Sequence, residues 1–342
     1  MTSTPHDAFI KAVYGEKEHA RAHLEAYLPP AITALVDLDS LSSPKGSFVD
    51  PELRQCHTDL LFQLTVAGRP ALACVLFDHR RAASKWVPLE LLRYMERIWA
   101  QWVADATPEQ RERGLPPNIP LVLFHGQQRW RAPTRFEGLL DVDEGTRGAL
   151  LPYSPDFGIA LLDLSEHDDR SLRGTALGRL ALFHFKHIDD PDLLDRLEDW
   201  AAVVVQVLQE SGLKALELSI RYILEASEVA RPDELGRRMA AIAGPLGREA
   251  VMSTAEKLRE EGREQGRKEG RKEGRKEGKK EGKREGKREG RMDMLVGLLT
   301  LRFGPLTDAA AARVRAASPD TLMVWSGRVL DARTVDEVFE GD

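Results

Sequence analysis

The sequence predicts a mixed domain of strands and helices, of the α/β or α+β class, followed by a helical region. Apolar runs of strand length alternate with an amphipathic helical stretch up to about residue 170. Beyond residue 175 the apolar residues recur at helical spacing instead. Apolar residues make up 42% of the 342-residue chain, which is enough to build a core and allows two or three domains.

The first half of the predicted domain contains a helix and a hairpin. Residues 6–28 carry apolar side chains at helical spacing, and the Pro29-Pro30 pair ends this predicted helix. Residues 59–66 and 71–77 predict two strands joined by the four-residue turn Ala-Gly-Arg-Pro. The second run is apolar without alternation, which is typical of a strand covered on both faces.

The second half continues with a helix and two more strands. Pro88 opens an amphipathic helix over 88–106, and proline suits the first helical turn because the N–H that it lacks would have no intrahelical partner there. Residues 119–126 and 158–164 predict the third and fourth strands. Amphipathic patterns then predict helices through residues 175–260 and three short helices in the last part of the chain.

A glycine recurs at every fourth position from Gly262 to Gly290, in units such as Gly-Arg-Lys-Glu. A period of four drifts about 40° per unit around a helix of 3.6 residues per turn, so the glycines form a spiral and no fixed packing seam. Each glycine costs about 1 kcal/mol of helix stability relative to alanine, and pairs such as Glu269 with Lys272 restore only a few tenths. We expect a solvated, mobile or partly helical linker, which acts either as a plain spacer or as a nucleic-acid tether.

Charge, cysteine content and hydropathy exclude several classes of protein. Residues 262–291 contain 14 Lys and Arg and 7 Glu, a net charge of +7, so the rest of the chain carries −13 of the total of −6. The two cysteines, Cys56 and Cys74, form no metal-binding pattern, which argues against a structural zinc site. The sequence contains neither a signal-peptide core nor an apolar run of about 18 residues. We therefore expect a cytoplasmic protein without a membrane partner.

Two aspartates border the predicted hairpin. Asp59 begins its first strand and Asp78 follows its second, so antiparallel pairing would bring both to the same end of the sheet. Carboxylate oxygens are the ligands that Mg²⁺ and Mn²⁺ prefer. Arg80 would share the strand face of Asp78, where it could hold a phosphate or the attacking water. The pattern favours metal-assisted phosphodiester hydrolysis, and the alternative is that the aspartates merely cap strand ends beside solvent.

Several stretches resemble the Rpn family of recombination-promoting nucleases, also described as YhgA-like transposases, within the PD-(D/E)xK nuclease superfamily. The matching stretches are HDAFIKAVY, SFVDPELRQCHTDLLFQLTV, LACVLFDHRRAASKWVPLELLRYMERIW, IPLVLFHGQQRW and FGIALLDLS, within residues 5–230. The resemblance implies a restriction-endonuclease-like αβββαβ core and a Mg²⁺-dependent (or Mn²⁺-dependent) DNA endonuclease, a hydrolase with DNA as partner. The stretch from LLTLRFGPL to DEVF resembles a small helical domain often fused to such proteins.

The resemblance also implies roles for individual residues. Asp59 matches the family's first catalytic aspartate, and Asp78 stands where the family has a metal-binding glutamate, so these two are the predicted metal ligands. Arg80 occupies the position of a catalytic glutamine. Asp7 and His79 are accessory candidates, with a helix-capping role as the alternative for Asp7.

The arginine departs from the family pattern and leaves a second function open. Arg80 is a poor proton acceptor and an apt partner for carboxylates or phosphates. The alternative is therefore a catalytically impaired paralogue that binds nucleic acid, regulates, or assembles into a homo-oligomer. The predicted parts are a nuclease-like domain, a helical extension, the charged repeat linker and a small helical C-terminal domain, at 1–172, 173–258, 259–291 and 292–342.

Overall fold

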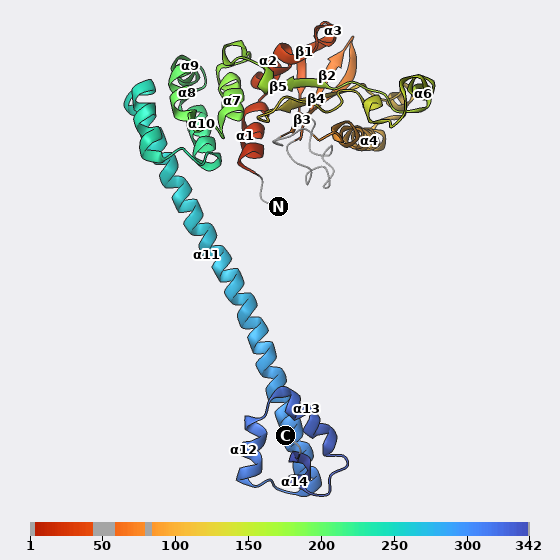
Figure 1. The fold of residues 1–342 in the computed structure, drawn as a ribbon, viewed down its shortest axis with the longest axis vertical. Helices are drawn as coiled ribbons and strands as arrows, with labels where there is room; N and C mark the ends of the chain where they lie inside the picture. Colours follow the sequence, from red (N-terminus) through yellow and green to blue (C-terminus); the bar gives the residue numbers. More distant parts are fainter. Residues whose placement is uncertain (1–3, 44–58, 79–83, 341–342) are drawn as a thin grey trace. The chain divides into compact units, whose positions relative to one another are not determined.

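A computed structural model describes residues 4–43, 59–78 and 84–340, with only the backbone described for residues 59 and 73–78. The chain forms two compact units, Met1–Lys257 and Leu258–Asp342. The first unit is a mixed α/β structure, with one sheet and a group of helices beside it (Figure 1). No helix in the described ranges is long and apolar enough to cross a membrane.

The sheet has five strands in the order β1-β2-β3-β4-β5. Their bounds are β1 Val36–Ser42, β2 Asp59–Val66, β3 Arg69–Asp78, β4 Asn118–Phe124 and β5 Ala160–Asp163. The pairs β1–β2 and β2–β3 are antiparallel, whereas β3–β4 and β4–β5 are parallel. The carboxyl ends of β3, β4 and β5 therefore meet at the edge of the sheet where β2 begins.

The predicted hairpin is confirmed, but its turn is shorter than expected. Val66 pairs directly with Arg69, so the turn consists of Ala67 and Gly68 alone. Both residues have positive φ, 48° and 75° respectively, as a two-residue turn with the twist of a hairpin requires. Pro70 is the second residue of β3 and precedes the pairing with β4, which starts at Leu72, so its missing N–H does not interrupt the parallel ladder.

The first strand, β1, was not among the strands that the apolar pattern predicted. It is an edge strand with polar residues at most positions, and only Leu38 and Leu41 are buried. Its presence completes the αβββαβ order that the family resemblance implied: helices, then β1 to β3, then α4 Val87–Asp105, then β4.

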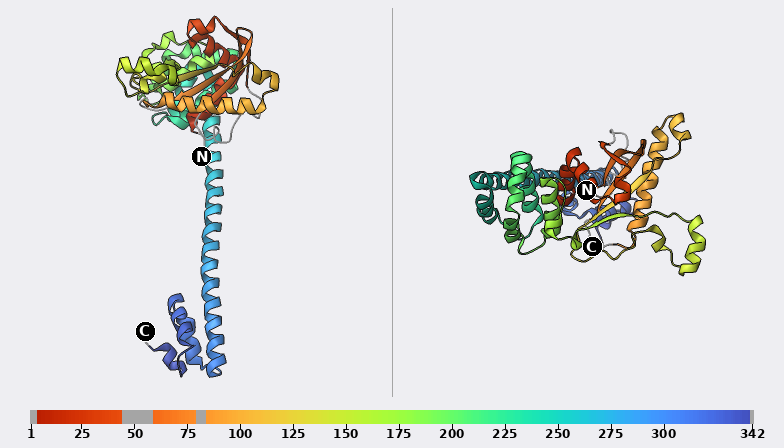
Figure 2. Two further views of the ribbon diagram at one scale, coloured as in Figure 1. Left: turned by 90° about the vertical axis from the view of Figure 1, so that its right-hand side faces the viewer. Right: turned by 90° about the horizontal axis from the view of Figure 1, so that it is seen from above.

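Helices cover both faces of the sheet (Figure 2). The single helix predicted over 6–28 is two helices, α1 Pro5–Tyr14 and α2 Lys17–Tyr27, followed by the short α3 Pro30–Thr33. On one face, apolar residues of α1 join the main core together with Leu123 of β4. On the other face lies α4, where Leu91 packs with Val122.

Further helices of the first unit lie before β4, between β4 and β5, and after β5. They are α5 Pro108–Glu112, η2 Phe136–Leu139, α6 Glu144–Leu150, η3 Leu151–Tyr153, η4 Leu164–Glu166, η5 Asp169–Ser171, α7 Ala176–His187, α8 Leu193–Asp199, α9 Ala201–Glu210 and α10 Gly212–Ala226. Helix α7 is central, since ten of its residues are buried. Its side chains continue the main core from the sheet into the helical group.

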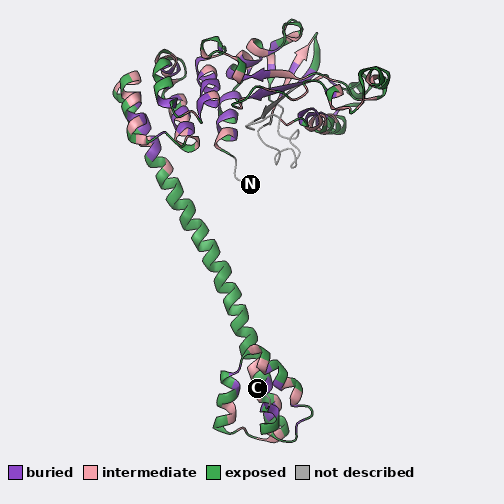
Figure 3. Cartoon of the chain, in the orientation of Figure 1, coloured by how far each residue is buried: buried purple, intermediate pink, exposed green. Residues whose placement is uncertain are grey.

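The glycine repeat lies within helix α11, Pro232–Phe303, which is interrupted once at Gly244 (φ 67°). The structure thus differs from the partly helical linker expected there, because residues 262–290 are helical throughout and exposed (Figure 3). The flanking turns explain the difference. Val251 before the repeat and Leu295 after it are fully buried, and extending a helix from anchored turns avoids the costly nucleation step.

The second unit has its own small core. Helices α12 Asp308–Ala316, α13 Pro319–Arg328 and α14 Val335–Phe339 pack on the last turns of α11, which confirms the three predicted helices. Leu299, Val314 and Trp325 lie at its centre, each 2% exposed or less.

Candidate functional site

The strand register brings the two predicted metal-binding positions to one edge of the sheet. Asp59 lies opposite Leu76, so Asp78 lies two residues farther along the neighbouring strand. Asp78 is in register with Phe124 of β4, and Phe124 with Asp163 of β5. Acidic residues therefore lie at the ends of three of these four neighbouring strands.

Both aspartate positions also belong to the same face of the sheet. Leu61 and Leu72 pack with Ile98 of α4, while Leu60, Phe62 and Leu64 lie against the main core. Residues two apart along a strand share a face, so Asp59 falls on the side of Leu61 and Asp78 on the side of Leu72. The backbone thus places both positions on the α4 face.

Helix α4, which packs on this face, has an acidic residue near its start. Its first turn contains Glu90, which is half-buried, and the helix starts shortly after β3 ends. Glu90 is not among the site residues predicted from the sequence. In the sequence, Glu90 is simply an acidic residue in the first turn of a predicted helix. Such residues are common because they stabilise the helix dipole, so the pattern does not by itself indicate a functional site.

The roles predicted for four residues depend on side chains that the structure does not describe. Arg80 and His79 lie outside the described residues. Among the described residues, no group of three or more His, Cys, Asp or Glu side chains is placed to hold a metal ion. The metal-binding role of Asp59 and Asp78 stays a prediction that is based on their backbone positions.

Asp7 has a clear structural role. It occupies the third position of α1, where its backbone N–H donates to Thr4 Oγ1 and its Oδ2 accepts from the Thr4 N–H, both at 3.2 Å. This reciprocal pair is a capping box, and Asp7 is 4% exposed. The alternative of an N-cap role for Asp7 is corrected in one respect: Thr4 is the N-cap residue, and Asp7 completes the cap from the third helical position.

A second polar cluster lies across the sheet from the aspartate positions. His125 follows Phe124 directly, so it falls on the opposite face, where its Nδ1 lies 3.1 Å from the Phe185 carbonyl oxygen. The His6 ring lies 5.7 Å from the His125 ring, and His6 Nδ1 is 2.7 Å from the Tyr222 hydroxyl. Burial lowers the pKa of His6, against the charges of nearby acidic residues. These contacts join the end of β4 to α1 and α10.

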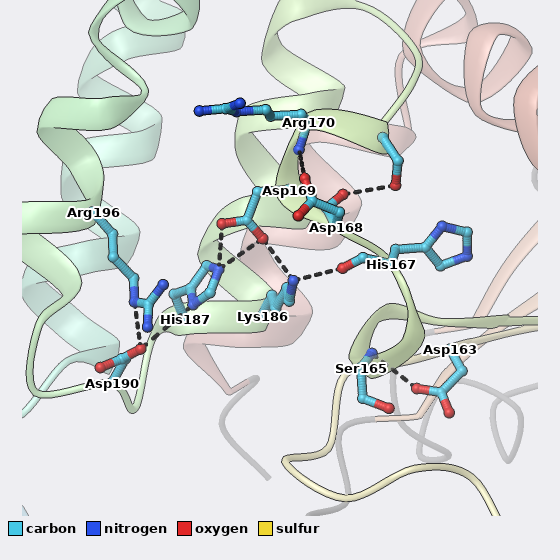
Figure 4. Close-up of polar contacts among 11 residues, drawn as sticks. Asp163, Ser165, His167, Asp168, Asp169, Arg170, Lys186, His187, Asp190 and Arg196 are labelled. Carbon is cyan, nitrogen blue, oxygen red and sulfur yellow. Dashed lines mark hydrogen bonds and ion pairs between the residues drawn. The ribbon is translucent and has the colours of Figure 1, made fainter.

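Asp163 joins the loop that follows β4 to the end of β5, and Figure 4 shows its contact with Ser165. Its Oδ2 accepts from the Trp130 N–H at 2.7 Å, and its Oδ1 accepts from the Ser165 N–H at 2.9 Å. Asp163 is 5% exposed, and these bonds satisfy a carboxylate that would otherwise be costly to bury. Asp163 therefore shapes the edge on which Asp59 and Asp78 lie.

We expect Asp163→Asn to loosen this loop, since the amide offers one acceptor oxygen where the carboxylate offers two. The loss should be about 1–3 kcal/mol of stability, the usual effect of leaving a buried donor unpaired. Hydrogen exchange should accelerate at the Trp130 amide before it accelerates elsewhere. Asp143→Asn is the control, because Asp143 caps an exposed helix and asparagine caps equally well. Unchanged hydrogen exchange at the Trp130 amide in Asp163→Asn would contradict the role of Asp163 in holding this loop.

An ionic cluster holds η5 against the end of α7 (Figure 4). Asp169 accepts from Lys186 Nζ at 2.6 Å and from His187 Nε2 at 2.9 Å, and Asp190 accepts from Arg196 Nε at 2.6 Å. Burial alone would raise the pKa of Asp169, but the hydrogen bonds and charges of His187 and Lys186 lower it to about 2. Each acid in this cluster is matched by a base, so we interpret it as a structural clamp.

The sequence of this chain is similar to a described protein family and to several named proteins. The family described as "Putative transposase, YhgA-like" matches residues 4–214. The recombination-promoting nucleases RpnD of Escherichia coli O157:H7 and RpnA of Escherichia coli strain K12 are each 27% identical to this chain. The RpnD match covers 76% of this chain and 96% of RpnD, and the RpnA match covers 77% of this chain and 86% of RpnA.

A relative with a different description is just as similar. The inactive recombination-promoting nuclease-like protein RpnE of Escherichia coli strain K12 is 29% identical, over 76% of this chain and 83% of RpnE. No solved structure matches the chain. The family match spans more than half of the chain and includes the whole sheet with its two aspartate positions. The chain belongs to the YhgA-like transposase family, and it is similar to proteins named recombination-promoting nucleases.

Proposed function

We propose that this protein is a metal-dependent DNA endonuclease of the recombination-promoting type, which hydrolyses phosphodiester bonds. The observation that carries the proposal is the register of β2 and β3, which places Asp59 and Asp78 at one edge and on one face. The names of the relatives RpnD and RpnA support the reaction class and, through it, DNA as the substrate.

The residue types at this edge fit a hard divalent cation. Carboxylates from Asp59 and Asp78 would hold Mg²⁺ or Mn²⁺, whose ligands in proteins are mainly oxygen atoms. When bound, such an ion polarises the phosphate and lowers the pKa of a coordinated water. The chain itself contributes the fixed spacing of the two strands, and Asp163 holds the neighbouring loop in place.

The proposal is tested by incubating purified full-length protein with supercoiled plasmid. We expect nicked and then linear DNA with Mg²⁺ or Mn²⁺, and neither product with EDTA. Activity that persists in EDTA would contradict metal dependence. Failure of the protein to nick DNA with either ion would contradict the endonuclease assignment itself.

A second candidate function is a catalytically impaired paralogue that binds DNA without cleaving it. Arg80, at the glutamine position of the resembled family, favours this candidate because its charge can neutralise the two aspartates in place of a cation. The name of the relative RpnE, an inactive nuclease-like protein of comparable identity, favours it as well.

The substitution Arg80→Gln discriminates between these two candidates. If Arg80 contacts the phosphate of an active enzyme, we expect Arg80→Gln to lower the nicking rate about tenfold, the value of one lost charge-assisted contact. Arg80→Lys should retain part of that rate because it preserves the charge. A nicking rate in Arg80→Gln above that of the wild type would instead support the impaired paralogue, with Arg80 as the group that excludes the metal.

A further inference from the structure

The longest exposed feature of the described chain is the part of α11 that contains the glycine repeat. Every residue from 259 to 290 is exposed. A Cβ atom added to any of the eight repeat glycines would meet no other atom within 4 Å. Figure 3 shows this stretch as uninterrupted exposed helix. Arg288 donates to the Arg315 carbonyl oxygen at 3.0 Å, but every residue of the stretch remains exposed, so its surface is accessible to a partner.

The charge of this stretch cannot be neutralised from within. Lys268 pairs with Glu264 at 2.7 Å, which shows that some internal pairing occurs. However, residues 262–291 contain 14 basic residues and only 7 acidic ones. Even complete pairing would leave seven positive charges without a counter-charge. The rest of the chain carries −13, so this stretch is a strongly positive segment in an otherwise acidic chain, as a polyanion-binding surface requires.

The arrangement of the basic side chains identifies the kind of partner. Each full unit has two adjacent basic residues, about 100° apart around the helix, and each next unit is turned by about 40° and raised by about 6 Å. The basic stripe therefore winds around the helix and completes a turn in about 54 Å. A helix that pairs with another helix needs a fixed apolar seam. A helix that lies on a membrane surface needs the same side facing the membrane along its whole length, often with apolar anchoring residues. The repeat from 262 to 291 has no apolar side chain and no fixed face.

We propose that residues 259–291 bind the phosphodiester backbone of DNA and hold it on the protein independently of cleavage. A nucleic acid backbone carries regularly spaced negative charges and requires no apolar contact, which matches a winding stripe of Lys and Arg. The choice of DNA among nucleic acids rests on the proposed function. Binding of this type is independent of base sequence and weakens steeply with salt because it releases condensed counterions.

The test measures DNA binding by the full-length protein in EDTA, so that cleavage does not contribute. One variant replaces the basic residue after each of seven glycines by glutamine, which lowers the net charge of residues 262–291 from +7 to 0. It changes Arg267, Arg271, Arg275, Lys279, Lys283, Lys287 and Arg291. We expect its affinity for a duplex of about 30 base pairs to fall at least tenfold, with a shallower dependence of log K on log salt.

The matched control makes the same number of substitutions with the opposite change in charge. It replaces the seven glutamates by glutamine, which raises the net charge from +7 to +14, at Glu264, Glu269, Glu273, Glu277, Glu281, Glu285 and Glu289. We expect tighter DNA binding and a steeper salt dependence. Glutamine, lysine, arginine and glutamate have similar helix propensities, so circular dichroism should show that both variants remain helical. If both variants bind DNA as the wild type does, the repeat is a solvated spacer and the proposal fails.

Two further measurements identify the preferred form of DNA and separate DNA binding by the repeat from cleavage at the sheet. Single-stranded DNA is compared with the duplex, and stronger retention of either one shows which form the stripe prefers. Asp59→Ala should bind DNA in EDTA as tightly as the wild type does. If Asp59→Ala loses nicking but still binds DNA, cleavage and binding are separate functions. If the charge-neutral variant binds DNA more weakly but still nicks it, the repeat binds DNA without taking part in cleavage. Failure of the nuclease proposal is thus distinguishable from failure of the binding proposal.

Discussion

Asp59→Ala is expected to reduce plasmid nicking at least 100-fold while the protein remains folded. Asp59 is the first residue of β2, and its position lies on the same face and edge as Asp78. With one of two carboxylates removed, the site would lose half of its proposed metal ligands, and with them the stabilisation of charge on the phosphate. The measurement is the initial rate of nicking in Mg²⁺, repeated in Mn²⁺ because weakened sites often show different occupancy by the two ions.

A matched control comes from the far end of the same sheet. Asp37 pairs with Thr65 near the hairpin turn and is exposed, so Asp37→Ala removes a strand carboxylate away from the site. Its nicking rate should stay within about twofold of the wild type, as expected for a surface change. If Asp59→Ala and Asp37→Ala nick DNA equally well, the edge of the sheet is not the catalytic site.

Asp78→Glu refines the same experiment. Glutamate is the residue that the family resemblance implies at this position, and it is one methylene longer than aspartate. If Asp78 binds the metal, Asp78→Glu should remain active while Asp78→Ala should fall to the level of Asp59→Ala. Equal activity in Asp78→Glu and Asp78→Ala would remove this residue from the site.

The hairpin was predictable because its signals are local. The apolar runs at 59–66 and 71–77 agree with β2 and β3 within two residues at each end. From these strands, antiparallel pairing determines which ends meet, and alternation determines which residues share a face. The relation of the Asp59 and Asp78 positions follows from those two rules, so the sequence alone contained it.

Other parts of the edge depend on contacts between distant residues. Asp163 matters because it accepts from the Trp130 N–H, 33 residues earlier, and no local pattern specifies that bond. Strand β1 was missed because an edge strand needs few apolar residues, and its polar positions resemble a loop. The repeat differs from expectation for a related reason: its own propensity is low, but packed turns beyond both ends sustain the helix.

Acidification from pH 7 to pH 5 is expected to lower the stability of the first unit by about 4 kcal/mol. Two histidines with strongly lowered pKa values contribute most of this loss, His23 of α2 and His184 of α7, which are 6% and 0% exposed. Burial lowers the pKa of His23 from 6.5 to about 4. Burial, assisted by the charge of His187, lowers the pKa of His184 to about 3.

Stability falls with falling pH because the unfolded chain takes up protons on these histidines at a higher pH than the folded chain does. Below pH 6.5 both histidines become protonated in the unfolded chain, while in the folded chain they stay neutral until the pH reaches 4 to 3. Stability is thus complete above pH 6.5 and falls as the pH drops below it. Each histidine contributes about 1.4 kcal/mol per pH unit over this range, or about 2 kcal/mol at pH 5.

The measurement is urea unfolding of the full-length protein at pH 7 and pH 5, followed by hydrogen exchange in α7 so that the first unit is observed alone. In His184→Gln the difference between the two pH values should shrink by about half, because glutamine does not titrate. Leu182→Ala is the control: it removes a fully buried side chain from the same helix and should cost about 2–5 kcal/mol equally at both pH values. A pH difference in His184→Gln as large as that of the wild type would show that His184 is not the group that carries this acid sensitivity.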